Sequence, residues 1–505
     1  MTDLKHFTIS QKPYSMENTI LAVFLAYTLL LFLVAHLASR KSSNNSFFTG
    51  NRKSPWFVVA YGMIGASLSG VTFMSVPGGV YSGQFTYFGI VLGYIIGYAV
   101  IAFLLLPLYY KLNLTSIYSY LGIRFGKSSE KTGSLLFIIS RLIGSAIRMY
   151  LVVFVLYEFV FKAWGIPFWI PAILFVMLIL FYTLKGGIKT IVWTDTLQTT
   201  FLLLAAIMTV IVILKTLNIS FGELMSVSAE KGYTKLFETD WSHSKFFVKQ
   251  ILSGAFITIA MTGLDQDMMQ KNLTCKSLKD AQKNVMTSSF FLVLVNILFM
   301  SLGAALILYA QETGFQLPTN ESGVVVNDKI FPSVAFSLNK LTSIVFMVGL
   351  IAAGYSSADG TLTALTTTFC FDFLHFDKND RISEEDKIKY RELIHIGFAL
   401  LYLLVIILFK PFHNESLIDK IFEIAGYTYG PLLGLYSFGL FVKNREPIDK
   451  LVPVIAICSP IISYILNTFS KELFFGYQFG FEILIVNGLL TFMALLLTSK
   501  KQIVK

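Results

Sequence analysis

The chain has 505 residues, of which 55% are hydrophobic and only 14% are charged, and its mean hydropathy is +0.68. A soluble protein of this length would carry roughly a quarter charged residues, so the composition excludes a soluble fold and indicates repeated membrane crossings. The net charge of +10 does not indicate nucleic-acid binding, because the lysines and arginines lie in short loops between apolar runs, where they reflect membrane topology.

Apolar runs long enough to cross a bilayer recur along the whole chain. A spanning helix needs roughly 20 apolar residues, and about 13 runs fit this length. They lie at residues 16–38, 56–80, 86–110, 133–160, 166–184, 190–215, 247–271, 285–311, 341–371, 392–409, 418–442, 450–469 and 478–499. The sequence therefore predicts an all-α polytopic membrane protein in which residues 1–505 form one integral membrane domain.

The basic residues predict the orientation of these spans. Lysines and arginines gather in alternate loops, at residues 40–53, 111–131, 185–189, 271–283, 378–391 and 443–450, and again at 500–505. Cytoplasmic loops carry the excess of positive charge. We therefore expect the N-terminus outside, the C-terminus in the cytoplasm, and a location in the cell membrane, either plasma or bacterial inner.

No enzymatic signature is present in the sequence. There is no phosphate-binding loop with a Gly-Lys-Ser/Thr ending, and the six histidines and three cysteines have no metal-site spacing. We expect a protein that is not an enzyme and that has no nucleic-acid partner and no obligate protein partner. Its expected partners are the lipid bilayer and a small-molecule solute.

The uncharged stretch between residues 62 and 79 has a composition that a lipid-facing helix does not need. Its small, polar or helix-loosening residues are Gly65, Ser67, Ser69, Gly70, Thr72, Ser75, Pro77 and Gly79. Loosened backbone within a bilayer is tolerated only where protein or a water-filled cavity surrounds it. An interrupted helix of this kind indicates the binding site of a secondary transporter, whereas close helix packing through small residues explains the same composition.

Two of the carboxylates inside predicted spans stand out, because ionisable residues in a membrane are costly and default to a functional hypothesis. Asp195 lies near the start of the sixth span, and Asp359 is the only charge between residues 341 and 371. Ser356, Asp359 and Gly360 share one helix face. Such oxygens suit a hard cation such as Na⁺. The competing interpretation is that Asp359 carries a proton as the coupling ion. Structural carboxylates paired with hydroxyls or with nearby lysines, Lys185 and Lys189, are the alternative.

Two arginines share one face of the fourth span. Arg141 and Arg148 flank Gly144 at helical spacing. Arg148 could hold a substrate carboxylate bidentately, be paired with a buried carboxylate, or reach the membrane surface by snorkelling if the span is shifted. We expect a structural or gating role for Arg141.

Later spans contain candidate gating residues. Asp265 and Asp267, at the edge of the seventh span, are expected in a solvated inner gate or loop anchor. Pro431 interrupts the helical hydrogen bonds of the eleventh span and could form a hinge.

At these residues the chain resembles the sodium:solute symporter family. The motifs that carry the resemblance are residues 69–77, 186–198, 266–271, 352–357 and 430–434, in this order. The resemblance implies a LeuT-like fold of two inverted five-helix repeats, at 56–215 and 247–442. One extra helix, at 16–38, would precede them and about two, at 450–499, would follow. The first helix of each repeat would be broken at the midplane.

The resemblance also implies sodium sites, with Na⁺ as the only metal. A first site would use the backbone carbonyls of Gly65, Leu68 and Ala353 with the hydroxyls of Ser356 and Ser357. A second cation site would involve Asp195, Ser356, Asp359 and Gly360. Asp359 stands where the sialic-acid branch has a serine, which would strengthen this site or replace its sodium with a proton.

By the same resemblance, the solute would contact one set of polar residues and the gates would use another. The solute set is Ser67, Ser69, Thr72, Tyr87, Arg148 and Thr262. The gating and hinge set is Pro77, Gln266, Asp267, Gly430 and Pro431. A sialic-acid transporter would have an arginine at the position of Gly144 and an aromatic residue at that of Thr262. These two differences argue against assigning sialic acid as the solute from the resemblance alone.

The function that we predict is sodium-coupled symport of a small polar organic solute into the cell by alternating access. A sugar, an amino acid and an organic acid all fit this description. The alternatives are a proton-coupled symporter and a sensor or channel with a transporter fold.

Overall fold

The computed structural model describes residues 16–39, 43–379, 381–409 and 417–501, and parts of the predicted basic loops, at 40–42, 380 and 502–505, lie outside them. The longer helices are α1 (Met16–Ser39), α3 (Trp56–Ser67), α4 (Gly70–Gly83), α5 (Phe88–Val100), α8 (Lys127–Phe159), α9 (Trp169–Leu217), α11 (Phe247–Thr258), α13 (Leu278–Thr313), α14 (Asn327–Leu338), α15 (Lys340–Thr368), α16 (Glu384–Leu408), α17 (Leu417–Phe441), α18 (Val452–Thr468) and α20 (Ile483–Thr498). The shorter ones are α2 (Asn44–Thr49), α6 (Leu106–Lys111), α7 (Ser119–Arg124), α10 (Phe221–Glu230), α12 (Gln266–Leu273) and α19 (Ser470–Leu473). Two short strands, β1 (Arg445–Glu446) and β2 (Lys500–Lys501), pair antiparallel.

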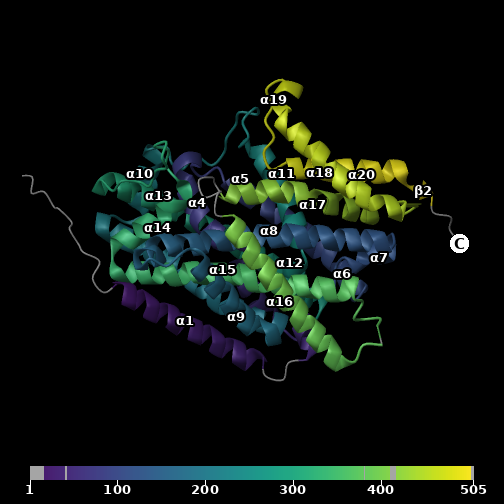
Figure 1. Cartoon of the computed structure of the whole chain (residues 1–505). Helices are drawn as coiled ribbons and strands as arrows, with labels where there is room; N and C mark the ends of the chain where they lie inside the picture. The colour runs from purple at the N-terminus through teal and green to yellow at the C-terminus, as the bar shows by residue number, and fades with distance from the viewer. Residues whose placement is uncertain (1–15, 40–42, 380, 410–416, 502–505) are drawn as a thin grey trace, which may run out of the picture.

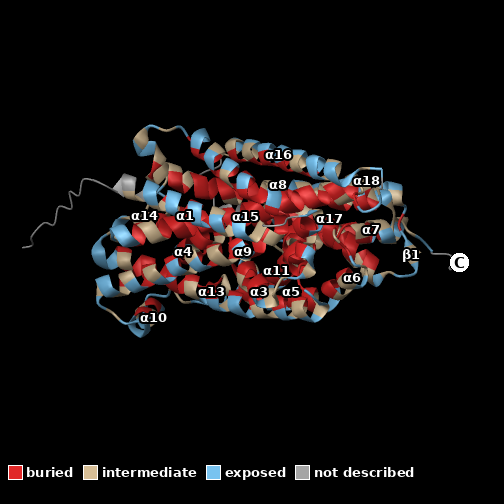
Figure 2. Cartoon of the chain, turned by 90° about the horizontal axis from the view of Figure 1, so that it is seen from below, coloured by how far each residue is buried: buried red, intermediate tan, exposed pale blue. Residues whose placement is uncertain are grey.

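The helices form a bundle around α15. Figure 1 shows the long helices running in the same general direction, with α1 at one edge and α18 and α20 at the other. The apolar window of α15 is 83% buried, against 28% for α1 and 22% for α18. Figure 2 shows the same gradient, with buried residues gathered at the centre and exposed ones outside. The peripheral helices expose leucine and isoleucine side chains, as expected of surfaces that face lipid.

Fewer helices meet the length and composition of a membrane span than the sequence predicts. Eight of the described helices do so, or up to ten if each of two bent pairs is one span. The predicted spans 166–184 and 190–215 fall almost entirely within α9, where the non-helical backbone of Gly187 (φ 52°, ψ −146°) separates two helical segments, so that the pair counts once. The last predicted span contains only the 16-residue helix α20, and the glycines and tyrosines of α17 lower its hydropathy.

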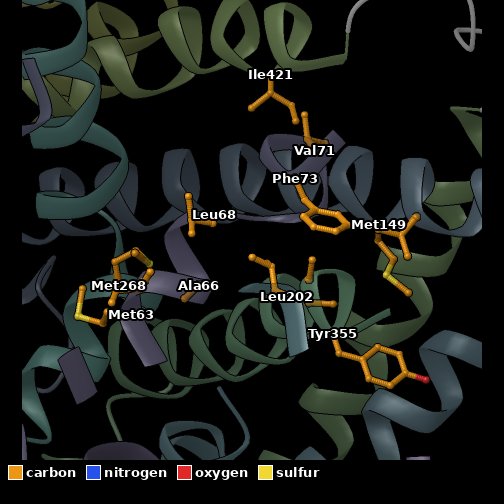
Figure 3. Packing of buried hydrophobic residues seen from close by; sticks show 14 of the residues in the cluster. Met63, Ala66, Leu68, Val71, Phe73, Met149, Leu202, Met268, Tyr355 and Ile421 are labelled. Carbon is orange, nitrogen blue, oxygen red and sulfur yellow. The ribbon is translucent and has the colours of Figure 1, made fainter. Parts of the chain in front are cut away.

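The first bent pair is the span that the composition of residues 62–79 singled out. Helices α3 and α4 meet at an angle of 58°, and the break falls at Leu68 and Ser69. The backbone N–H of Leu68 donates to the carbonyls of Ile64 and Gly65, at 3.1 and 3.2 Å. The regular helical hydrogen bonds therefore end at Leu68. Figure 3 shows Ala66 and Leu68 before the break and Val71 and Phe73 after it.

The second bent pair begins the second predicted repeat. The segment Phe247–Gly263 and helix α12 meet at 67°, and a π-helical turn, Ile259–Gly263, precedes the break. Asp265 starts the new helix, because its carboxylate accepts a hydrogen bond from the backbone N–H of Met268 at 3.1 Å. Both breaks fall in the spans that the resemblance predicts to be broken.

Candidate functional site

A cavity of about 90 Å³ lies beside the break between α3 and α4. All six residues predicted to contact the solute line it: Ser67, Ser69, Thr72, Tyr87, Arg148 and Thr262. They come from α3, the break itself, α4, the start of α5, α8 and the π-helical turn before α12. The structure thus brings together residues that are separated by up to almost two hundred positions in the sequence.

Several cavity residues were not predicted from the sequence. Tyr94, Tyr98, Asn296 and Phe422 also line the cavity. The hydroxyl of Tyr94 lies 2.7 Å from that of Tyr87, and the hydroxyl of Tyr98 lies 3.2 Å from that of Ser67. A signal for the tyrosines was available, because positions 87, 94 and 98 are spaced to share one helix face.

Arg148 presents a positive charge to the cavity. It is half-buried, and within the described part of the chain it has no ion pair with a carboxylate. Arg141, two turns earlier on α8, is in contrast paired with Asp267 and lies 3.6 Å from Asp265. The predicted pairing of Arg148 with a buried carboxylate is therefore not seen among the residues described, and its predicted contact with the solute stays a prediction.

The first turn of α4, just after the break, packs against α15, which carries Ala353, Ser356 and Ser357 of the predicted first sodium site. A Cβ added to Gly70 would lie 3.8 Å from the backbone nitrogen of Gly354, so the first turn of α4 touches α15 next to Ala353. Ser357 is buried, and its Oγ has no hydrogen-bond partner among the residues described. A buried hydroxyl without a partner costs free energy unless a ligand satisfies it. This oxygen therefore fits the role of a cation ligand.

Asp195 connects α3, α9 and α15. Its Oδ1 accepts a hydrogen bond from the Ser356 hydroxyl at 2.9 Å, and its Oδ2 lies 2.9 Å from Nζ of Lys271. A Cβ on Gly62 of α3 would come within 2.9 Å of the Asp195 Cβ. Only glycine allows this close approach of α3 to α9. The ammonium that pairs with Asp195 belongs to Lys271. The alternative of a structural carboxylate had instead suggested Lys185 and Lys189 as its partners.

The prediction of a solvated gate at Asp265 and Asp267 is wrong. Their exposed fractions are 0% and 1%. The second break turns them inward, where Arg141 lies between them and Tyr429 donates a hydrogen bond to Asp265 at 2.6 Å. Lys271 lies 3.6 Å from Asp267. Burial without these partners would be prohibitive.

Asp359 is fully buried and is held by uncharged donors. Its Oδ2 accepts hydrogen bonds from the hydroxyl of Tyr182 at 2.8 Å and the amide of Gln198 at 3.4 Å. Its Oδ1 accepts one from the backbone N–H of Gly360 at 2.6 Å. A Cβ on Gly360 would overlap the carboxylate of Asp267. Asp195, Ser356, Asp359 and Gly360 thus lie in one buried cluster.

Gln266 and Pro77 have different surroundings. Gln266 holds the loop before α7, because its amide donates to the Thr115 carbonyl at 2.7 Å and its oxygen accepts from the Ile117 N–H at 2.9 Å. Pro77 lies inside α4, away from the observed break, with its carbonyl against Gly303.

Gly430 and Pro431 lie in α17 where it packs on α20. A proline at position 431 leaves the carbonyl of Tyr427 without its helical partner. The amide of Asn487 donates to this carbonyl at 2.9 Å and to that of Gly426 at 3.0 Å. Gly430 leaves room for Asn487, which a Cβ would overlap. In this conformation Asn487 of α20 thus replaces the hydrogen bond that Pro431 removes from α17.

Comparison with known proteins adds independent information. The family model of the sodium:solute symporter family matches residues 47–446. The chain is 25% identical over 481 residues to the sodium/sialic acid symporter SiaT of Proteus mirabilis, covering 93% of this chain and 94% of the relative. It is 25% identical over 440 residues to the human sodium-coupled monocarboxylate transporter 1, covering 82% and 67%. The solved structure of a Na⁺-coupled sialic acid symporter superposes with a TM-score of 0.80 at 23% identity, covering 96% of this chain and 99% of that one.

Proposed function

Because the chain belongs to the sodium:solute symporter family, we propose that it imports a small polar organic solute together with Na⁺ by alternating access. The observation that carries the proposal is the cavity beside the first break. It is lined by hydroxyls from both sides of the broken helix and by Arg148, and the unpartnered Ser357 hydroxyl lies on the neighbouring helix α15.

The lining favours a solute that carries both hydroxyl or amide groups and an acidic group. Ser67, Ser69 and Thr72 supply hydroxyls that can donate and accept, and Asn296 supplies an amide. Arg148 would receive a carboxylate, since a guanidinium binds carboxylates bidentately. The sodium/sialic acid symporter and the sodium-coupled monocarboxylate transporter compared above are both named for acids.

Sodium would couple the break to α15. Carbonyls of Gly65, Leu68 and Ala353 and the hydroxyls of Ser356 and Ser357 would bind one Na⁺ between the two elements. Because Na⁺ would then bind better to the conformation in which they are close, it would shift the protein toward the state that is ready for solute. A membrane potential of about 100 mV would add roughly 2.3 kcal/mol per charge moved inward.

The structure fits an outward-facing state of this cycle. On the side of Gln266, the hydrogen bonds to residues 115 and 117 and the buried charges of α12 would form the closed inner gate. On the opposite side lies a second cavity of about 270 Å³, and Tyr87 and Phe422 line both cavities. With the predicted orientation, the second cavity would be the external vestibule. The two five-helix repeats remain part of this proposal.

The test is sodium-driven uptake by the purified protein in proteoliposomes. A panel of acids and their neutral analogues, including N-acetylneuraminate and short monocarboxylates, is supplied with an inward Na⁺ gradient or an inward H⁺ gradient. Sodium-driven, saturable accumulation of an acid supports the proposal. Uptake that follows only the H⁺ gradient would favour a proton-coupled symporter, and equilibration without accumulation would favour a channel.

The double variant Ser356→Ala with Ser357→Ala tests the first sodium site. It should abolish sodium-stimulated uptake while the protein is still expressed. The matched control is Ser459→Ala with Ser463→Ala on the peripheral helix α18, where both hydroxyls bond only to carbonyls of their own helix, at 2.7 and 2.9 Å. Unchanged sodium dependence in the first variant rejects the site.

A further inference from the structure

Lys271 occupies the place where the sequence predicts a second cation. Its side chain is 1% exposed, and Nζ lies 2.9 Å from Asp195 and 3.6 Å from Asp267. We propose that Lys271 is a resident cation that takes the place of a second sodium, so that the protein binds a single Na⁺ per transport cycle. This inference rests on the proposed function, because it assumes the first sodium site.

The oxygens that a second sodium would need are already engaged. Asp195 is contacted by Lys271 on one oxygen and by the Ser356 hydroxyl on the other. Both oxygens of Asp359 accept hydrogen bonds, from Tyr182 and Gln198 and from the N–H of Gly360. A sodium ion in this cluster would have to displace these donors.

At Asp195 the charges give the same result, whereas Asp359 is held by uncharged donors and has no cationic partner among the residues described. Arg141 pairs with Asp267 and lies near Asp265, and Lys271 pairs with Asp195. A sodium ion bound to Asp195 would lie beside an ammonium that is covalently tethered and buried. Two cations at this distance repel each other strongly because little water screens them. The tethered one is present in every molecule, whatever the sodium concentration.

The same arrangement predicts that removing the ammonium creates a sodium site. Without Lys271, Asp195 would keep only the Ser356 hydroxyl, and Asp267 would keep only Arg141. A buried carboxylate that loses its counter-ion needs a replacement. Sodium fits this requirement, since it prefers oxygen ligands and carries one positive charge.

The test is equilibrium binding of ²²Na⁺ to the purified full chain. We expect one saturable site with a Hill coefficient of one in the wild type. Lys271→Met should bind twice as many ions with a Hill coefficient above one, and Lys271→Arg should return to one site. The matched control is Lys249→Met, which removes another buried ammonium, one that lies 3.7 Å from the ring centre of Tyr477. This control should keep one site.

The outcomes separate this inference from the proposed function. Two sites in the wild type would overturn the inference, and so would a folded Lys271→Met variant that still binds one ion. If Lys271→Met does not fold, Lys271→Gln and the wild-type count still decide the question. No saturable sodium binding, or a single site that Ser357→Ala leaves unchanged, would instead refute the sodium site of the proposed function.

Discussion

Gly65 gives a sharp test of the packing that holds the broken helix in place. A Cβ at this position would overlap Oγ1 of Thr199 and lie 3.1 Å from its Cβ and 3.2 Å from its Cα. The Thr199 hydroxyl cannot move freely, because it donates to the carbonyl of Asp195 at 2.7 Å. Overpacking of a well-packed core costs about 1–3 kcal/mol. We therefore expect Gly65→Ala to lower the free energy of unfolding by this amount.

A double-mutant cycle assigns the effect to this contact. Thr199→Ala alone should cost about 1 kcal/mol, since it removes one buried hydrogen bond. The pair Gly65→Ala with Thr199→Ala should recover most of the loss, because only contacts near 3.1 Å remain. The coupling energy should be about 1 kcal/mol or more. Unfolding in detergent, followed with and without Na⁺, measures all four proteins.

The sodium readout and the control complete this test. Gly65→Ala should also weaken sodium binding, because it displaces the Gly65 carbonyl. Each 1.4 kcal/mol of binding free energy that is lost in this way would weaken the affinity about tenfold. Gly79→Ala on α4 is the matched control, because nothing lies within 4 Å of a Cβ there. If Gly65→Ala is as mild as this control, or if Thr199→Ala does not rescue it, the packing argument fails.

Three further predictions concern other parts of the site. Arg148→Gln should remove binding of acidic solutes and leave ²²Na⁺ binding intact, and loss of both would point to a structural role for this arginine. Arg141→Met should lower the free energy of unfolding by about 3–5 kcal/mol, because it leaves buried carboxylates without a counter-ion. Lys162→Met, which breaks an exposed pair with Glu158, should show no measurable change in the same assay. Asn487→Ala should cost about 1–3 kcal/mol in thermal or denaturant unfolding, since the Tyr427 carbonyl, which has no helical donor because of Pro431, loses the Asn487 amide.

The class of protein and the position of the first helix break could be predicted from the amino-acid sequence alone. Glycines, hydroxyls and a proline in an uncharged run are visible without any structure, and residues 62–79 proved to contain the break. The six predicted solute residues could be chosen because their chemistry and the resemblance to a family pointed to the same positions, and the family is confirmed. The roles of these residues stay predictions.

The pairing of the buried charges, in contrast, became visible only in the folded structure. Asp195 and Lys271 lie on different helices, and no periodicity relates them. Asp265 and Asp267 looked solvated because they lie at the edge of an apolar run, yet the second break turns them into the core. Hydropathy also does not reveal how the chain passes from one predicted run to the next at Gly187, where the backbone is not helical. Pairing and burial depend on which helices pack together, and this depends on contacts between residues far apart in the chain.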